Sequence, residues 1–150
     1  MSKNDIEPYC EVLSFDKTKH FDDINNWWSL YFDGDSFPID CVPENGVVVS
    51  HKNKIVASCF IYVNETKLAH MAFAIADYNL GPGRRCFFVK KAIEASIQKT
   101  KEIVGEDVVI SSLTDHAVVG RMYVESGFTC IGEGDMYMYS SDKNKIDFIR

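Results

Sequence analysis

The sequence feature that most constrains the fold is a nearly uncharged segment that leads through a glycine-rich turn into a long helical pattern. The segment Leu68–Ala76 carries no Asp, Glu, Lys or Arg, as expected of a central strand that is covered on both faces. Gly81-Pro82-Gly83 then interrupts the chain. Apolar residues recur at helical spacing from Arg84 to Val104. The sequence therefore predicts a buried strand, a turn and an amphipathic helix, the elements of an α/β fold.

Alternation along this strand predicts one face of large side chains and one of mostly small side chains. Met71, Phe73 and Ile75 are expected to share the first face. The second face is then formed by His70, Ala72, Ala74 and Ala76. Its alanines would let a ligand approach the strand closely.

Turn residues and apolar alternation predict further strands at Cys10–Phe15, Val47–Ser50, Ile55–Val63, Val108–Leu113, Phe128–Ile131 and Met136–Tyr139. A helix capped by Asp16 or Thr18 is expected to carry an apolar stripe of Phe21, Ile24, Trp27, Trp28 and Tyr31. Another helix is expected at His116–Ser126, capped by Thr114 or Asp115, and Gly132-Glu133-Gly134-Asp135 is expected to join the last two strands. Together these elements predict a mixed, mostly antiparallel sheet of about six to seven strands with helices on both faces.

The chain has 150 residues, of which 46% are apolar and 25% are charged, and these values predict one domain over residues 1–150. Its polar end, from about residue 141, is expected to be loosely ordered. The net charge of −6 argues against general binding to nucleic acid or to a membrane surface. No apolar run approaches the roughly 18 residues that cross a membrane, and no secretion signal is evident. We therefore expect a cytoplasmic protein.

The five cysteines and four histidines show none of the spacings of a metal site. They form no Cys-x-x-Cys pair and no helical histidine pair, so no metal is expected. The cysteines are expected to be small buried side chains in a reducing compartment.

The turn between the buried strand and the long helix is a candidate anion-binding site. Backbone N–H groups at the start of a helix lack partners, and the helix dipole is positive there. Gly81 and Gly83 would let a phosphate come within hydrogen-bonding distance, and Arg84 and Arg85 add positive charge. The alternative is that the glycines and Pro82 only turn the chain.

Tyr123, in the predicted helix His116–Ser126, is a second candidate functional residue. Its hydroxyl would reach a reacting atom if this helix packs beside the glycine-rich turn. The alternative is a core tyrosine whose hydroxyl bonds a backbone carbonyl.

The order of elements, the Gly81-x-Gly83 pattern and the Tyr123-x-x-x-Gly127-Phe128 ending resemble the GNAT superfamily of acyl-coenzyme A N-acyltransferases. The resemblance covers about residues 9–140 and is best from Leu68 to Ile131. The chain also resembles the divergent GNAT-like proteins of tailed phages, which would place it in the host cytoplasm. Proteins of the superfamily are often dimers, so the resemblance also implies a homodimer.

The resemblance implies acetyl-CoA as the cofactor and a place for its pyrophosphate. The superfamily's loop, a basic or amide residue followed by two spaced glycines, corresponds to Tyr78, Gly81 and Gly83. Tyr78 departs from that pattern, and Pro82 lacks an N–H group. Arg84 and Arg85 are expected to compensate, since charge-assisted contacts are strong.

The remaining cofactor contacts and the chemistry follow from the same resemblance. The backbone of Phe73, Ala74 and Ile75 would pair with the pantetheine arm, and His116 would donate a hydrogen bond to the cofactor. Tyr123 is the expected acid for the departing thiolate, and His70 is the candidate base for the amine, although a structural His70 is the alternative. Trp27 and Trp28 would border the acceptor, or else one of them belongs to the core.

The resemblance implies an N-acetyltransferase that moves an acetyl group from acetyl-CoA to a primary amine by direct attack. The acceptor would be a small-molecule amine or a protein lysine. The alternative is a GNAT-like binding or virion interaction module without efficient catalysis, which Tyr78 and Pro82 favour. A third hypothesis is a Cys-His hydrolase that uses Cys59 or Cys86, but the sequence around these cysteines carries no signature of such an enzyme.

Overall fold

The structure, a computed structural model, describes residues 10–114, 116–131 and 136–142. Within them a single mixed sheet has the strand order β1-β2-β3-β4-β5-β7-β6. The strands are β1 (Cys10–Ser14), β2 (Asn45–His51), β3 (Lys54–Tyr62), β4 (Leu68–Ala76), β5 (Val109–Leu113), β6 (Thr129–Ile131) and β7 (Met136–Ser140). Only β4 and β5 pair in parallel; the other described pairs are antiparallel. This confirms the predicted mixed, mostly antiparallel sheet.

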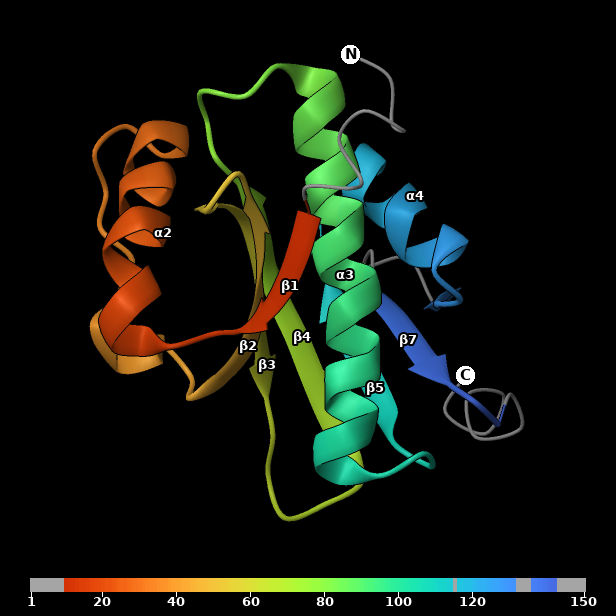
Figure 1. The fold of residues 1–150 in the computed structure, drawn as a ribbon. Helices are drawn as coiled ribbons and strands as arrows, with labels where there is room; N and C mark the ends of the chain where they lie inside the picture. The colour runs from red at the N-terminus through yellow and green to blue at the C-terminus, as the bar shows by residue number, and fades with distance from the viewer. Residues whose placement is uncertain (1–9, 115, 132–135, 143–150) are drawn as a thin grey trace.

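Helices cover both faces of the sheet (Figure 1). Helix α2 (Lys17–Tyr31) packs on one face, where its buried side chains Ile24 and Trp27 join Phe60 and Ile75 of the sheet. Helices α3 (Pro82–Val104) and α4 (Ala117–Glu125) pack on the other face. A short 3-10 turn, η2 (Ile39–Cys41), precedes β2. We refer to the two sides as the α2 face and the α3 face.

Local sequence chemistry accounts for the helix ends. Asp16 caps α2, because its carboxylate accepts the Thr18 N–H at 3.0 Å. Gly105 ends α3 with a φ of 131°, a conformation that favours glycine. Helix α4 begins after His116, which serves as its N-cap residue without a side-chain cap bond. Asp115, the alternative cap, lies outside the described residues, as do residues 132–135 of the expected last turn and most of the tail from about residue 141.

The regular alternation predicted for β4 is wrong beyond residue 72, because the strand contains a β-bulge. Ser58 pairs with Ile75 but Phe60 pairs with Ala72, so Cys59 alone faces two residues of β4. Phe73 takes a φ of 59°, a left-handed conformation that costs a non-glycine residue about 1–3 kcal/mol. The bulge shifts the alternation, so Met71 lies on the α3 face whereas Ile75 lies on the α2 face.

The cysteines also differ from expectation. Cys59 is fully buried, but Cys41, Cys86 and Cys130 are exposed. Cys86 lies within the apolar helical pattern that begins at Arg84, but it is exposed, and Phe88 is the first residue of α3 that belongs to the core. Spacing of three and four residues in the sequence does not show which side chains near the start of a helix the sheet will cover.

Among the described residues, the helices are all too short or too polar to span a bilayer.

Candidate functional site

The two parallel strands β4 and β5 separate partway along their length. Their pairing covers Leu68–His70 and Val109–Ser111, whereas β4 continues to Ala76 and β5 to Leu113. At the point of separation the Ser112 hydroxyl donates a hydrogen bond to the Met71 carbonyl at 2.8 Å. Beyond it, the β5-facing edge of β4 is unpaired with β5 in the described chain. Such an edge offers backbone groups to an extended ligand.

The first turn of α3 leaves backbone donors without a cap. Gly81 is the N-cap residue, Pro82 follows it, and no side chain caps the helix. A Cβ atom added at Gly81 or Gly83 would meet nothing within 4 Å, so open space surrounds both. The preceding turn is held from within, because Asp77 accepts the Asn79 N–H at 3.0 Å. The corner is thus a rigid, open helix N-terminus that suits an anion.

The two arginines after this turn point to different neighbours. The Arg84 guanidinium lies 5.9 Å from the ring centre of Phe88. The Arg85 guanidinium lies 5.8 Å from the ring centre of Tyr78 and, through Nη1, 3.5 Å from the Tyr31 hydroxyl. Both Nε atoms are buried without a hydrogen-bond partner among the described residues. Because both Nε atoms are enclosed, a hydrogen bond from either arginine to a ligand at the turn would come from its terminal guanidinium nitrogens.

Tyr78, the departure from the superfamily loop, is exposed and lies between Tyr31 and Arg85. Its ring meets that of Tyr31 edge-on at 5.0 Å. Tyr31 in turn donates to the Ala76 carbonyl at 3.0 Å, which ties α2 to the end of β4. The hydrogen bond with Tyr31 raises the pKa of Arg85. Arg85 thus places a positive charge beside Tyr78 at the turn before α3.

Tyr123 lies on the α3 face and is only 1% exposed. Its ring contacts Phe128 at 5.0 Å and Tyr137 at 5.6 Å. Burial, followed by the nearby Cys59, raises the pKa of Tyr123 well above its usual value, while a hydrogen bond with Ser112 acts in the opposite direction. The phenol is therefore a core group that stays protonated at neutral pH, and it adjoins the serine at the strand separation.

His70 is the last residue of β4 that pairs with β5, and it is half-buried on the α2 face. Its Nδ1 lies 3.0 Å from the Ser111 hydroxyl, and its ring lies 6.2 Å from that of Tyr62. Burial lowers the pKa of His70, and a backbone hydrogen bond with Ser111 opposes this. The imidazole is consequently neutral at pH 7, the form that accepts a proton.

The structure separates the two tryptophans. Trp27 is 3% exposed and belongs to the core, so the core alternative holds for it. Trp28 is only partly buried, and its ring lies 5.6 Å from that of Phe73. Phe73 was expected to contribute backbone alone, but its ring also joins this aromatic group.

Two further residues that the resemblance implies as cofactor contacts, His116 and Ala74, have the following positions. His116 is exposed at the start of α4, where its N–H donates to the Thr114 hydroxyl at 3.1 Å. Ala74 packs toward the α3 face. Sequence reasoning missed Tyr31, Ser111 and Ser112. The two serines had a signal, since they are an adjacent polar pair within a predicted buried strand.

Cys59 is unsuited to nucleophilic chemistry. Burial raises its pKa to about 11, so the thiol stays protonated at neutral pH. Within the described part of the chain, no three His, Cys, Asp or Glu residues gather to hold a metal ion.

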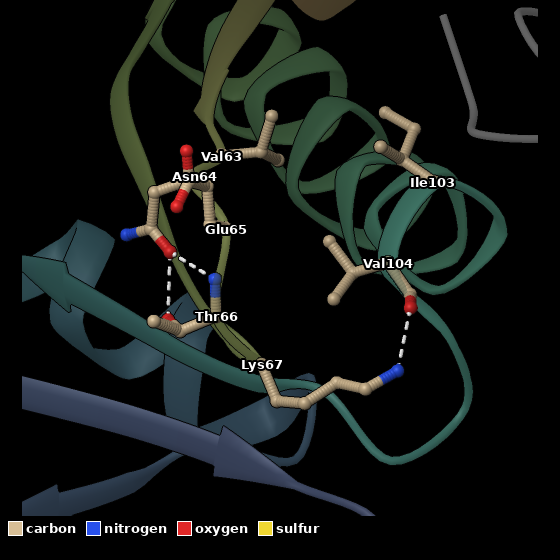
Figure 2. Close-up of a pocket in the computed structure, with 7 residues that line it drawn as sticks. All are labelled: Val63, Asn64, Glu65, Thr66, Lys67, Ile103 and Val104. Atoms are coloured by element: carbon tan, nitrogen blue, oxygen red, sulfur yellow. Dashed lines mark hydrogen bonds between the residues drawn. The ribbon is translucent and has the colours of Figure 1, made fainter.

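A pocket lies at the opposite end of α3 from the glycine-rich turn (Figure 2). The β3–β4 connection and the end of α3 line it, with the residues Val63, Asn64, Glu65, Thr66, Lys67, Ile103 and Val104. The Lys67 ammonium donates to the Val104 carbonyl at 3.0 Å and lies 3.2 Å from the Asp107 carboxylate. Lys67 thus closes the C-terminus of α3, a structural role, and the pocket is separate from the strand separation.

Comparisons with known proteins agree on the fold. No protein-family model matches the sequence, and no curated protein matches it as a relative. Solved structures do match. An acetyltransferase of the GNAT family from Staphylococcus aureus covers 89% of this chain and 99% of its own, with a TM-score of 0.64 at 14% identity. An aminoglycoside 6'-acetyltransferase type Ii covers 87% and 96%, with a TM-score of 0.67 at 11% identity.

A GNAT-family N-acetyltransferase from Escherichia coli in complex with CoA covers 93% of this chain and 85% of its own, with a TM-score of 0.64 at 10% identity. The chain therefore has the fold of GNAT acetyltransferases.

Proposed function

We propose that the protein is an acyl-CoA N-acyltransferase that moves an acetyl group from acetyl-CoA to a primary amine. The observation that carries the proposal is the strand separation beyond His70 beside the uncapped first turn of α3. An unpaired strand edge suits the amide-bearing arm of coenzyme A, and a helix N-terminus suits its pyrophosphate. Structural neighbours that were crystallised with CoA support this choice of cofactor.

The residues at the corner fit a diphosphate. Gly81 and Gly83 leave open space, and the N–H groups of Gly83 and Arg84 point out of the first turn as in any helix. Arg84 and Arg85 would supply charge-assisted hydrogen bonds. The edge of β4 at Phe73, Ala74 and Ile75 would pair with the pantetheine arm, and His116 would reach the cofactor from the start of α4.

The reaction joins the amine nitrogen to the thioester carbonyl carbon. A C–N bond forms, the C–S bond breaks, one proton leaves the amine, and one proton reaches the thiolate, so the products are an amide and free CoA. The bound cofactor supplies the activated acetyl group. The chain's own residues supply neutral His70 as the base for the amine and protonated Tyr123 as the acid for the thiolate. A strand N–H near Ala74 would hold the thioester oxygen.

The acceptor in this proposal is an amine on a small molecule, a peptide or a protein lysine. One structural neighbour is named for an aminoglycoside, and another is an N-acetylglutamate synthase of which this chain spans 33%. These names support small amines as a class.

The alternative is a GNAT-like module that keeps CoA without efficient catalysis. The observation in its favour is the core position of Tyr123 together with the non-basic Tyr78 in the loop.

Two measurements test the proposal in sequence. Acetyl-CoA at about 100 times its Kd should add about 2.7 kcal/mol to the free energy of unfolding, which a melting curve detects. Thiol release from acetyl-CoA with a panel of amines should then follow. No stabilisation by millimolar acetyl-CoA would rule out both the enzyme and the cofactor-binding module, and stabilisation without thiol release would favour the module.

A further inference from the structure

We infer that the acceptor of this site is a primary amine carried on an aromatic group, which rests on a surface formed by Phe73 and Trp28. This inference depends on the proposed function and adds the chemical class of its acceptor. It is carried by the bulge in β4, which turns an aromatic ring toward solvent on the α2 face.

Phe73 is exposed although four rings surround it. Its ring centre lies 4.9 Å from Phe37, 5.6 Å from Trp28, 6.3 Å from Phe60 and 6.4 Å from Tyr62. The side chain is nonetheless 42% exposed. A phenylalanine with so many aromatic neighbours would ordinarily be buried in a core. We therefore interpret the exposed side of the Phe73 and Trp28 rings as a binding surface, which we call the platform.

The backbone of Phe73 holds the ring in this position. A φ of 59° is unfavourable for a residue with a bulky side chain, and glycine or asparagine would adopt it more readily. The bulge also reverses the alternation, so a regular strand would direct this side chain to the α3 face. Backbone strain of this kind gathers at binding sites, where surrounding contacts maintain it.

The platform is continuous with the candidate catalytic group. Tyr62 contacts both Phe73 and His70, at 6.4 and 6.2 Å between ring centres, so the three side chains share the α2 face. Residues 70 and 73 are separated by a strand length on the order of 10 Å. An aromatic ring at Phe73 with a short alkyl chain would therefore place its amine near His70, at the strand separation.

Chemistry at the platform selects against polar acceptors. Carboxylates and sugar hydroxyls placed against these rings would lose water without gaining hydrogen bonds from the rings themselves. An aromatic amine gains ring contacts instead. The Phe32 ring extends this aromatic surface at 4.3 Å from Trp28, and the exposed carboxylates of Asp33 and Asp35 lie one and three residues after Phe32 in the chain. Their negative charge favours the approach of an ammonium group.

The test compares acceptors and variants with the full chain. Thiol release from acetyl-CoA is measured with 2-phenylethylamine, with butylamine, with glutamate and with an aminoglycoside. We expect 2-phenylethylamine to have the highest kcat/KM. Phe73→Ala should raise the KM for 2-phenylethylamine about tenfold and the KM for butylamine by much less, whereas Phe73→Tyr, which keeps a ring, should raise the KM for 2-phenylethylamine less than Phe73→Ala does.

Leu30→Ala is the matched control, since Leu30 lies on the same helix as Trp28 and is 44% exposed. It should change neither KM. A higher kcat/KM for glutamate or the aminoglycoside, or an unchanged KM in Phe73→Ala, would overturn the inference and leave the acyltransferase proposal intact.

Failure of the acyltransferase proposal has a different signature. In that case acetyl-CoA neither stabilises the protein nor releases thiol. Ligand-observed NMR then measures whether 2-phenylethylamine binds directly to the protein, which tests the aromatic site independently of catalysis. Binding that Phe73→Ala abolishes would uphold the site, and no binding to the wild-type chain would overturn it.

Discussion

The Nδ1 atom of His70 lies 3.0 Å from the hydroxyl of Ser111, and that hydroxyl also donates to the Ala69 carbonyl at 3.4 Å. A hydroxyl that donates to Ala69 has its oxygen left to accept a proton from His70 Nδ1, and in that arrangement the lone pair of a neutral His70 is on Nε2. In the proposed mechanism Ser111 is therefore the residue that positions the His70 imidazole.

The first prediction concerns this pair. Ser111→Ala should lower kcat about tenfold, while His70→Gln should lower it about 100-fold, within the range for general base catalysis. Both should leave the KM for acetyl-CoA unchanged. Ser111→Thr, which keeps the hydroxyl, should restore activity. Burial lowers the pKa of His70 below 6.5. The kcat/KM should therefore fall once the pH drops below this lowered pKa, because His70 is then protonated. His70→Gln should lack this acid limb, and a limb retained in His70→Gln would assign it to another group.

The second prediction concerns Tyr123. Tyr123→Phe should lower turnover about 100-fold with little change in the melting-temperature shift that acetyl-CoA produces. Tyr139→Phe, on the neighbouring strand β7, is the control and should retain turnover. Equal turnover in Tyr123→Phe and the wild type would make this phenol structural, as its burial among Phe128 and Tyr137 allows.

The third prediction concerns the open corner of α3. Arg84→Ala combined with Arg85→Ala should weaken acetyl-CoA binding by at least about tenfold, since each charge-assisted hydrogen bond contributes more than a neutral one. Turnover at saturating cofactor should persist. Lys19→Ala, which removes one exposed cation from α2, is the control for the loss of positive charge elsewhere on the surface. Calorimetric titration with acetyl-CoA measures the Kd of the double arginine variant and of the control. Equal Kd values in the two would place the pyrophosphate elsewhere.

Much of this architecture could be predicted because its signals are local. The bounds of β4 match the uncharged segment Leu68–Ala76, and Asp16 caps α2 as its position before the apolar stripe indicates. The glycine-rich turn is also where the sequence suggested it. Each of these features is fixed by a few adjacent residues.

The remaining features depend on contacts between distant residues. No glycine or asparagine marks the bulge at Phe73, so the reversal of faces is invisible along the chain. Helical spacing places Trp27 and Trp28 on the same stripe, and only the position of β4 decides which is buried. The partnership of Tyr31 with Arg85 spans 54 positions and has no signal in either local segment.

The fourth prediction concerns the packing of α4 on β7. A Cβ atom at Gly120 would overlap the Tyr137 hydroxyl and lie 2.9 Å from its ring carbon Cζ. Gly120→Ala should therefore destabilise the protein by about 1–3 kcal/mol, as overpacking does. Tyr137→Phe should recover part of that loss, because it removes the nearest atom. Urea unfolding of the two single variants and the double variant measures the coupling, and additive effects would contradict the clash.

The fifth prediction concerns stability at acidic pH. His20 Nδ1 accepts the Asp16 N–H at 3.0 Å, which requires an unprotonated nitrogen. Burial is the main cause that lowers the pKa of His20 in the folded state, below its usual 6.5. The unfolded chain then binds protons more readily, so this contribution to stability is present above pH 6.5 and is lost as the pH falls below it. Urea unfolding at pH 7.5 and 5.5 should show a smaller decrease in His20→Gln than in the wild type.

The extra residue in β4 links the hydrophobic interior to the solvent-facing aromatic rings. Removing one residue at position 73 or 74 would restore a regular ladder with β3 and leave Met71 and Ile75 on their opposite faces. It would, however, remove the ring of residue 73 or turn it away from the α2 face. The extra residue is therefore not needed for the two apolar layers, and what it adds to the strand is an exposed aromatic ring.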